Sequence, residues 1–144
     1  MKNTCLIDTN LIVYALNKDS EFHKECLAIM SAALNGKLKA AIAEKSLYEF
    51  YAITTDKRRV EKPVSVKKAT EIIELLIGSK IDILYSSPAS ISKTIELIRK
   101  YKVRKQDIFD YVLIGIMLAS SITQIYTYNK KDFSRIKEIR VLEL

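Results

Sequence analysis

The sequence predicts an α/β protein, a three-layer α/β/α sandwich built around a mostly parallel sheet of about five strands. Short runs of apolar residues alternate along the chain with stretches in which apolar residues recur every three or four positions. Uniformly apolar runs are typical of parallel strands covered on both faces, and the longer period is typical of amphipathic helices. The 144 residues include three Gly and two Pro, and no tract is of low complexity. We therefore expect a single domain over residues 1–144.

The expected strands are the apolar runs, at residues 4–7, 38–43, 81–85, 124–127 and 140–142. The first run stops at Asp8, and Asn129 and Asp132 follow the fourth run. The functional cleft of an open parallel sheet lies outside the carboxyl ends of its strands. Polar residues that directly follow a strand are therefore the first candidates for a functional site.

The expected helices lie between these runs and are marked by their end residues. The first extends from Ser20 to Gly36, and the second is capped by Ser46 and carries Glu49. The others extend from Ser65 to Gly78, from Ser87-Pro88 through Ile98, and from Asp107 to Ser121. Residues 57–63 and 102–106 are expected to be basic turns.

The charge of the chain favours polyanionic partners. Lys and Arg number 24 against 17 Asp and Glu, which gives a formal charge of +7. The basic residues gather at 57–62, 99–105 and 130–137, and a solvated, salt-bridged face is the ordinary explanation of such clusters. Two of the clusters flank candidate acids, where a phosphate backbone would approach. The candidate phosphate-binding residues there are Arg104, Lys105, Lys130 and Lys131.

Several classes of protein are excluded by what the sequence lacks. It contains no GxSxG, Walker or GxGxxG motif, and its one histidine, His23, cannot supply a paired acid and base. Cys5 and Cys26 match no zinc-ligand spacing, so we expect buried, reduced thiols. The longest uncharged segment has too few apolar residues to span a bilayer. We expect a soluble, cytoplasmic protein with no membrane association.

Acidic residues recur at element ends or on apolar helices of the predicted sheet. Asp8 follows a strand, Glu49 lies in a helix with a core-facing orientation expected, and Asp107 and Asp110 share one helix face. Acids that meet in one cleft repel each other, and a divalent cation with oxygen ligands, Mg²⁺ or Mn²⁺, relieves the repulsion. Metal-dependent phosphodiester hydrolysis is the leading chemistry. Taken singly, each acid is more simply explained as a helix cap or turn former.

Four segments, in this order, resemble the PIN-domain family, and within it the small VapC-type toxin ribonucleases of prokaryotic toxin-antitoxin pairs. The segments are Leu6-Ile7-Asp8-Thr9-Asn10, Tyr48-Glu49-Phe50, residues 107–114 with Asp107 and Asp110, and residues 126–133 with Asn129 and Asp132. The resemblance spans essentially the whole chain. The fold of this family, a parallel five-stranded sheet between helices, agrees with the fold expected from periodicity.

The resemblance implies a Mg²⁺-dependent endoribonuclease, with Mn²⁺ as the alternative ion. It makes Asp8 and Asp110 the primary metal ligands and Glu49 the third carboxylate. Asn129 takes the fourth position, or Asp132 if the loop is shifted. Asn10, Asp107 and Asp132 are auxiliary site residues. The resemblance also implies RNA as the substrate, a homodimer, and an antitoxin protein whose tail blocks the site.

Two alternatives stay open at this point. One is a catalytically silent PIN-like module that binds RNA or a protein through its basic clusters, because Asn129 removes one charge from the acidic set. The other is a nuclease acting on branched DNA, which shares the carboxylate chemistry but usually needs a longer chain. Metal-dependent turnover, rather than binding, separates the first alternative from the enzyme.

Overall fold

The computed structural model describes Met1 and residues 3–144, and a five-stranded sheet forms its centre. The strand order is β3-β2-β1-β4-β5, and every described pairing is parallel. The strands are β1 (Cys5–Ile7), β2 (Ala40–Ala43), β3 (Asp82–Leu84), β4 (Gln124–Tyr126) and β5 (Arg140–Val141). The α/β fold expected from the sequence is confirmed, and the sheet is parallel throughout rather than mostly so.

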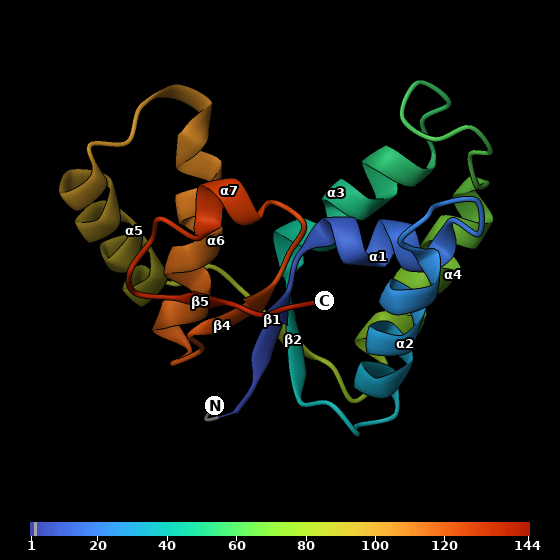
Figure 1. Cartoon of the computed structure of the whole chain (residues 1–144), viewed down its shortest axis with the longest axis horizontal. Coiled ribbons are helices and arrows are strands. Elements are labelled where there is room, and N and C mark those ends of the chain that lie inside the picture. The colour runs from blue at the N-terminus through green and yellow to red at the C-terminus, as the bar shows by residue number, and fades with distance from the viewer. Residues whose placement is uncertain (2) are drawn as a thin grey trace.

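Helices cover both faces of this sheet (Figure 1). One face carries α1 (Thr9–Leu16), α2 (His23–Leu34), α3 (Glu44–Thr54) and α4 (Val66–Ile77). The other carries α5 (Pro88–Tyr101), α6 (Ile108–Ala119) and the short α7 (Lys130–Phe133), with a 3₁₀ turn, η1 (Lys105–Asp107), before α6. In the part of the chain that the structure describes, no helix is long and apolar enough to cross a membrane.

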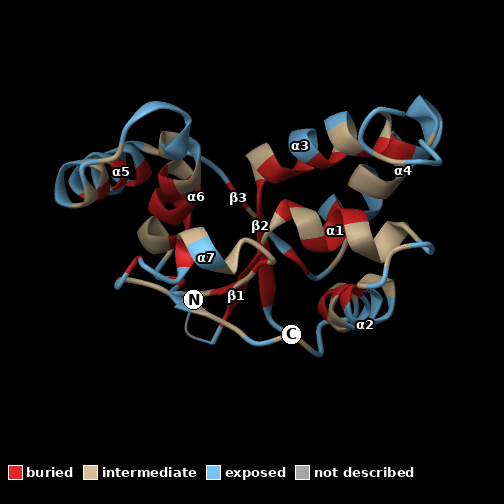
Figure 2. Ribbon diagram, turned by 45° about the horizontal axis from the view of Figure 1, so that its top comes forward, coloured by how far each residue is buried: buried red, intermediate tan, exposed pale blue. Residues whose placement is uncertain are grey.

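The strands are apolar on both faces because each face contributes to a core. Cys5 and Ile7 of β1 pack with α1–α4, whereas Leu6 between them packs with α6 on the other side. This alternation follows from the two-residue period of a strand. Figure 2 shows the buried strands at the centre and the exposed outer faces of the helices. Cys5 and Cys26 are buried free thiols, as expected.

Two helices were not anticipated from the sequence, α1 and α7. In α1 three consecutive residues, Leu11, Ile12 and Val13, are all buried, so the segment lacks the period of an amphipathic helix. The helix is enclosed by the sheet, α2 and α3. Helix α7 has only four residues, which is too short to produce a pattern.

The beginning of α3 also differs from the expected one. Ser46 was expected to cap this helix, but the N-cap is Ala43, and the helix starts directly where β2 ends. Ser46 lies inside the first turns, buried, and its hydroxyl has no hydrogen-bond partner among the described residues. The earlier start places Lys45 inside the first turn of α3, four residues before Glu49.

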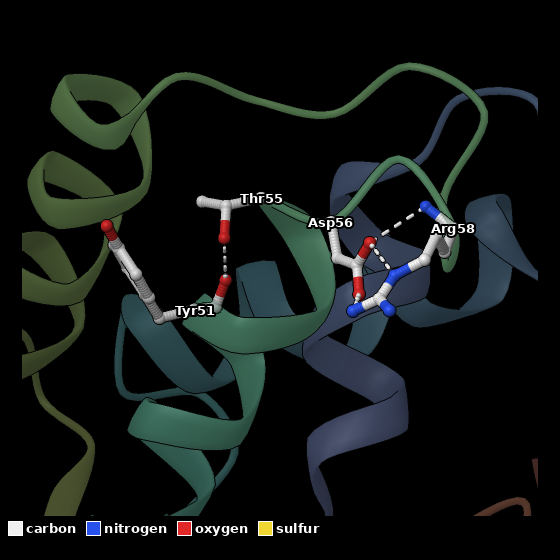
Figure 3. A network of polar contacts seen from close by, with 4 residues as sticks. All are labelled: Tyr51, Thr55, Asp56 and Arg58. Atoms are coloured by element: carbon white, nitrogen blue, oxygen red, sulfur yellow. Dashed lines mark hydrogen bonds and ion pairs between the residues drawn. The ribbon is translucent and has the colours of Figure 1, made fainter.

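The basic loop after α3 is neutralised in part by nearby acids. The Arg58 guanidinium donates to both carboxylate oxygens of Asp56 at 3.1 Å, and the Arg58 backbone N–H donates to the same carboxylate at 2.8 Å (Figure 3). The Thr55 hydroxyl closes the last turn of α3 by donating to the Tyr51 carbonyl at 2.7 Å (Figure 3). Lys62 pairs with Asp19 at 3.5 Å. This cluster therefore fits the ordinary explanation of a salt-bridged surface.

Gly115 allows the close contact between α5 and α6. A Cβ atom at this position would lie 2.1 Å from the Thr94 hydroxyl oxygen and 2.8 Å from the Ser90 carbonyl oxygen. These distances are far inside van der Waals contact, and one of the two atoms is backbone, which cannot turn aside. The position therefore requires glycine for reasons of space.

We expect Gly115→Ala to destabilise the protein by about 1–3 kcal/mol, the usual cost of overpacking. An alanine inside a helix normally stabilises it by about 1 kcal/mol relative to glycine, so the sign itself tests the close contact. Urea unfolding followed by circular dichroism measures the change. Gly78→Ala is the matched control, because its Cβ would meet nothing nearer than 3.4 Å. Equal stability of the two variants would contradict the packing argument.

Candidate active site

The order in which successive strands are added to the sheet reverses at β1. From β1 it continues to β2 and β3 on one side, and it then returns to place β4 on the other side of β1. In open parallel sheets such a switch point leaves a crevice at the carboxyl ends of the two strands, where ligands bind. Asp8 follows β1 and Thr127 follows β4, so both lie at this point. In Figure 1 the chain leaves β1 for α1 at the upper end of the sheet.

Asp8 is held by hydrogen bonds to both of its carboxylate oxygens. Oδ1 accepts the Thr9 backbone N–H at 2.8 Å, which makes Asp8 the N-cap of α1. Oδ2 accepts the Thr127 hydroxyl at 2.7 Å and, at a longer 3.5 Å, the Asn10 side-chain amide. Both explanations of Asp8 from the sequence therefore apply, since it caps a helix and also lies at the switch point.

Burial raises the pKa of Asp8 above its ordinary value, and the nearby Glu49 carboxylate adds to the rise. The hydrogen bonds from Thr127 and Thr9 act in the opposite direction, as does the positive charge of Lys45. Burial dominates because an ionised carboxylate loses more hydration than the protein groups return. The ionised form of Asp8 is therefore costly in the folded protein.

Glu49 is tied to Asp8 through a shared neighbour. The Thr9 hydroxyl donates to Glu49 Oε2 at 3.0 Å, while Thr9 also donates its backbone N–H to Asp8. The other oxygen of Glu49 pairs with the Lys45 ammonium at 2.9 Å. The core-facing orientation expected for Glu49 is wrong: its side chain is 46% exposed, because α3 turns this face toward the sheet edge and solvent.

Asp110 brings a carboxylate from the other layer of helices. It lies in the first turn of α6, and in the described part of the chain its carboxylate accepts no hydrogen bond and forms no ion pair. Burial raises its pKa, and repulsion from Asp132, Asp8 and Asp107 adds to the rise. Lys45 opposes the shift. Asp110 and Asp8 are therefore near enough to repel each other although they come from opposite faces of the sheet.

The loop after β4 supplies the remaining polar groups. The Asn129 backbone N–H donates to the Thr127 hydroxyl at 2.9 Å, and the Tyr128 N–H donates to the Asn10 side-chain oxygen at 3.4 Å. Asn129 is the N-cap of α7, yet its side chain makes no capping hydrogen bond to any described residue. Asp132 lies in the first turn of α7 and is half-buried. Among the acids that raise the pKa of Asp110 by repulsion, Asp132 has the largest effect.

The candidate phosphate-binding residues flank this edge in two groups. Arg104 and Lys105 are exposed next to Asp107, and Arg104 lines a pocket of about 240 Å³ that also includes Tyr101, Lys102, Asp107 and Arg135. Lys131 is exposed on α7, whereas Lys130 is paired with Glu143 at 3.4 Å. Three of the four cations are therefore directly available at the surface.

The donors around this edge suit a hard divalent cation. They are the carboxylate oxygens of Asp8, Glu49, Asp110 and Asp132 and the amide oxygens of Asn10 and Asn129, the ligand types that Mg²⁺ and Mn²⁺ prefer. Burial is the main cause that raises the pKa of Asp8 and of Asp110, and repulsion from neighbouring carboxylates adds to it; a bound cation would relieve that repulsion. Among the described residues, however, no three His, Cys, Asp or Glu side chains are grouped closely enough to hold one ion as they stand.

Three residues that shape this edge received no role from the sequence alone: Thr9, Thr127 and Lys45. Thr9 and Thr127 stand in the segments that carried the resemblance, but a threonine after a strand is common and signals nothing by itself. Lys45 stands four residues before Glu49, which is the spacing of a helical ion pair and could have marked it.

A comparison with sequence models of protein families finds one match, to the PIN domain, over residues 5–139. No curated protein sequence matches the chain significantly.

Comparison with solved structures finds chains of the same fold. "Crystal structure of VapBC2 from Rickettsia felis bound to a DNA fragment from their promoter" gives a TM-score of 0.67 at 18% identity, covering 98% of each chain. VapC20 of Mycobacterium tuberculosis, described as a sarcin-ricin loop cleaving toxin, gives 0.68 at 12% identity, covering 94% of this chain and 98% of that one. A toxin-antitoxin complex from Klebsiella pneumoniae gives 0.65 at 16% identity, covering 96% of each. At these identities the likeness shows a shared fold.

We expect Asp8→Asn to raise the thermal midpoint by a few degrees at pH 7.5 in EDTA. The folded-state pKa of Asp8 lies above its ordinary value of 3.8, so its ionisation disfavours folding. That penalty is absent below the unfolded-state pKa and develops as pH rises through the folded-state pKa. The advantage of the variant should therefore shrink toward pH 4, as differential scanning calorimetry would measure.

The exposed Asp82→Asn on β3 is the control, and we expect it to change the midpoint little at any pH. An Asp8→Asn protein less stable than wild type at pH 7.5 would mean that the two hydrogen bonds to Asp8 outweigh the cost of burying its charge.

Proposed function

The chain belongs to the PIN-domain family, and from that premise we propose that it is a metal-dependent endoribonuclease, the toxin of a type II toxin-antitoxin pair. One observation carries the proposal. Asp8 follows β1, Glu49 lies on α3 and Asp110 lies on α6. Asp8 shares its neighbour Thr9 with Glu49, and its charge adds to the rise in the pKa of Asp110, so Asp8 links the acids of the two helix layers. Capping explains Asp8 alone, but it gives no reason for acids from both helix layers to gather at one edge.

Asp8, Glu49 and Asp110 would hold the ion, Mg²⁺ or Mn²⁺, with Asn129 or Asp132 at a fourth position. When bound, the ion supplies positive charge that polarises a phosphate oxygen and makes a water molecule a better nucleophile. The protein's own part is orientation. Thr9 and Thr127 fix the Asp8 carboxylate, and Thr9 also holds Glu49, so these oxygens need little rearrangement when charge develops on the phosphate.

RNA is the proposed substrate and an antitoxin the proposed partner. VapC20, of the same fold, is described as cleaving the sarcin-ricin loop, and the Klebsiella pneumoniae structure is a toxin-antitoxin complex. The charge of +7 and the exposed Arg104, Lys105 and Lys131, with Lys130 released from Glu143, would attract the RNA backbone. We further propose a homodimer acting in the cytoplasm. The exposed apolar side chains that a second copy could cover form two separate groups, Leu75 and Ile77 on α4 and Ile91 and Ile95 on α5.

A second candidate function is a silent PIN-like module that binds RNA or a protein. Two observations favour it. Asn129 adds no negative charge to the acidic set, and among the described residues no three His, Cys, Asp or Glu side chains are grouped closely enough to hold an ion. Such a module would keep salt-sensitive RNA binding through its basic clusters and would show no turnover.

We expect Asp110→Asn to lower RNA cleavage by about 100-fold or more, the usual cost of losing one electrostatic contributor in an active site. The substitution keeps the size of the side chain but removes its charge, and Asp110 has no described partner to lose. The assay uses labelled hairpin RNAs, one of them with a sarcin-ricin loop sequence, with Mg²⁺, Mn²⁺ or EDTA, and resolves the products on a gel.

Asp82→Asn serves as the matched control and should cleave like the wild type, because Asp82 is exposed on β3 away from the candidate site. Metal-dependent cleavage by wild type and Asp82→Asn alone would support the proposal. Equal cleavage by Asp110→Asn would remove Asp110 from the site. Binding without cleavage by all three proteins would favour the silent module.

A further inference from the structure

Lys45 is a cation placed among the candidate metal ligands. Its ammonium lies 2.9 Å from Glu49 Oε1, and its side chain is 27% exposed. In every other ion pair between described residues the cation is at least 41% exposed. Lys45 is therefore the most buried of these cations, and its charge is less screened by solvent than theirs.

The local helix does not favour a cation at this position. Lys45 is the second residue of α3, near the positive end of the helix dipole, where an acid such as Glu44 is favoured. Its pairing with Glu49 also runs in the less favourable direction, with the lysine on the N-terminal side. The position of Lys45 in α3 therefore gives no reason for a cation, and the reason lies in the carboxylates around it.

The compensation comes from the carboxylates of the candidate site. Besides contacting Glu49, Lys45 acts against the rise in the pKa of both Asp8 and Asp110. Its charge therefore reaches acids from β1, α3 and α6. The Thr9 hydroxyl holds the second oxygen of Glu49, so both oxygens of this carboxylate already have donors. One ammonium thus partly neutralises a set of three carboxylates.

We propose that Lys45 is an internal counter-ion that stabilises the metal-free site and competes with the divalent cation for Glu49. This role of Lys45 rests on the proposed metal site and concerns how tightly that site binds its ion. A metal ion entering the site would have to take Glu49 from Lys45 and accept a neighbouring positive charge. Lys45 therefore lowers the affinity for metal while it stabilises the protein without metal.

The test measures metal binding itself. Isothermal titration calorimetry with MnCl₂ compares wild type with Lys45→Met, which keeps the aliphatic length and removes the charge. We expect Lys45→Met to bind Mn²⁺ about tenfold more tightly, the change produced by one favourable charge interaction. Lys45→Gln is the second uncharged variant, and Lys45→Arg should bind Mn²⁺ like wild type.

Thermal unfolding provides an independent measurement. In EDTA, Lys45→Met should unfold at a lower temperature than wild type, because three carboxylates lose their counter-ion. Saturating MnCl₂ should abolish this difference in unfolding temperature between Lys45→Met and wild type. Lys67→Met is the matched control, since Lys67 and Glu71 form the same i,i+4 pair on α4, at 3.9 Å and far more exposed. Lys67→Met should bind Mn²⁺ like wild type, and MnCl₂ should raise its unfolding temperature by as much as that of wild type.

The outcomes separate this inference from the proposed function. If wild type binds Mn²⁺ and Lys45→Met and Lys45→Gln bind it no more tightly, the competition is wrong while the metal site stands. Unchanged stability of both variants in EDTA would equally overturn the counter-ion role. If neither wild type nor the uncharged variants bind Mn²⁺, the metal site fails and the inference fails with it.

Discussion

Repulsion between carboxylates at the end of a covered parallel sheet is the constraint on which the rest of this structure depends. Because both faces of the sheet are covered by apolar cores, charged side chains can gather only at the ends of the strands. In this protein several acids lie at the carboxyl end. Ionised groups so close together oppose folding unless hydrogen-bond donors or cations surround them. Thr9, Thr127 and Lys45 supply these groups, and each comes from the start of a helix or the end of a strand.

The two helix layers contribute different halves of the site, so the packing of each layer sets its geometry. Glu49 and Lys45 belong to α3 on one face, whereas Asp110 belongs to α6 on the other, and Asp8 lies between them on β1. The position of α6 depends on its contact with α5, which has no space for a methyl group at Gly115. Because protein interiors are close-packed, a shift of α6 at that contact would carry Asp110 with it.

Local signals predicted the elements that have their own pattern. Pro88 and Gly36 marked helix ends correctly, and the five apolar runs became five strands. Helix α1 was missed because three consecutive residues, Leu11, Ile12 and Val13, are all buried, which leaves no amphipathic period. The candidate acids were chosen by their places after strands or on apolar helices. The bond from Thr127 to Asp8 joins residues 119 positions apart, and no local pattern encodes such a contact.

The strand order also controls when the site is completed during synthesis. The ribosome releases β1 first, yet β1 receives its second neighbour only when β4 has emerged. Asp8 obtains the Thr127 hydroxyl at that same late moment. A nascent or truncated chain that ends before Thr127 therefore lacks the short hydrogen bond to Asp8 Oδ2, although Asp8, Glu49 and Asp110 are already present in it. The full set of contacts around Asp8 can therefore form only when translation is nearly finished.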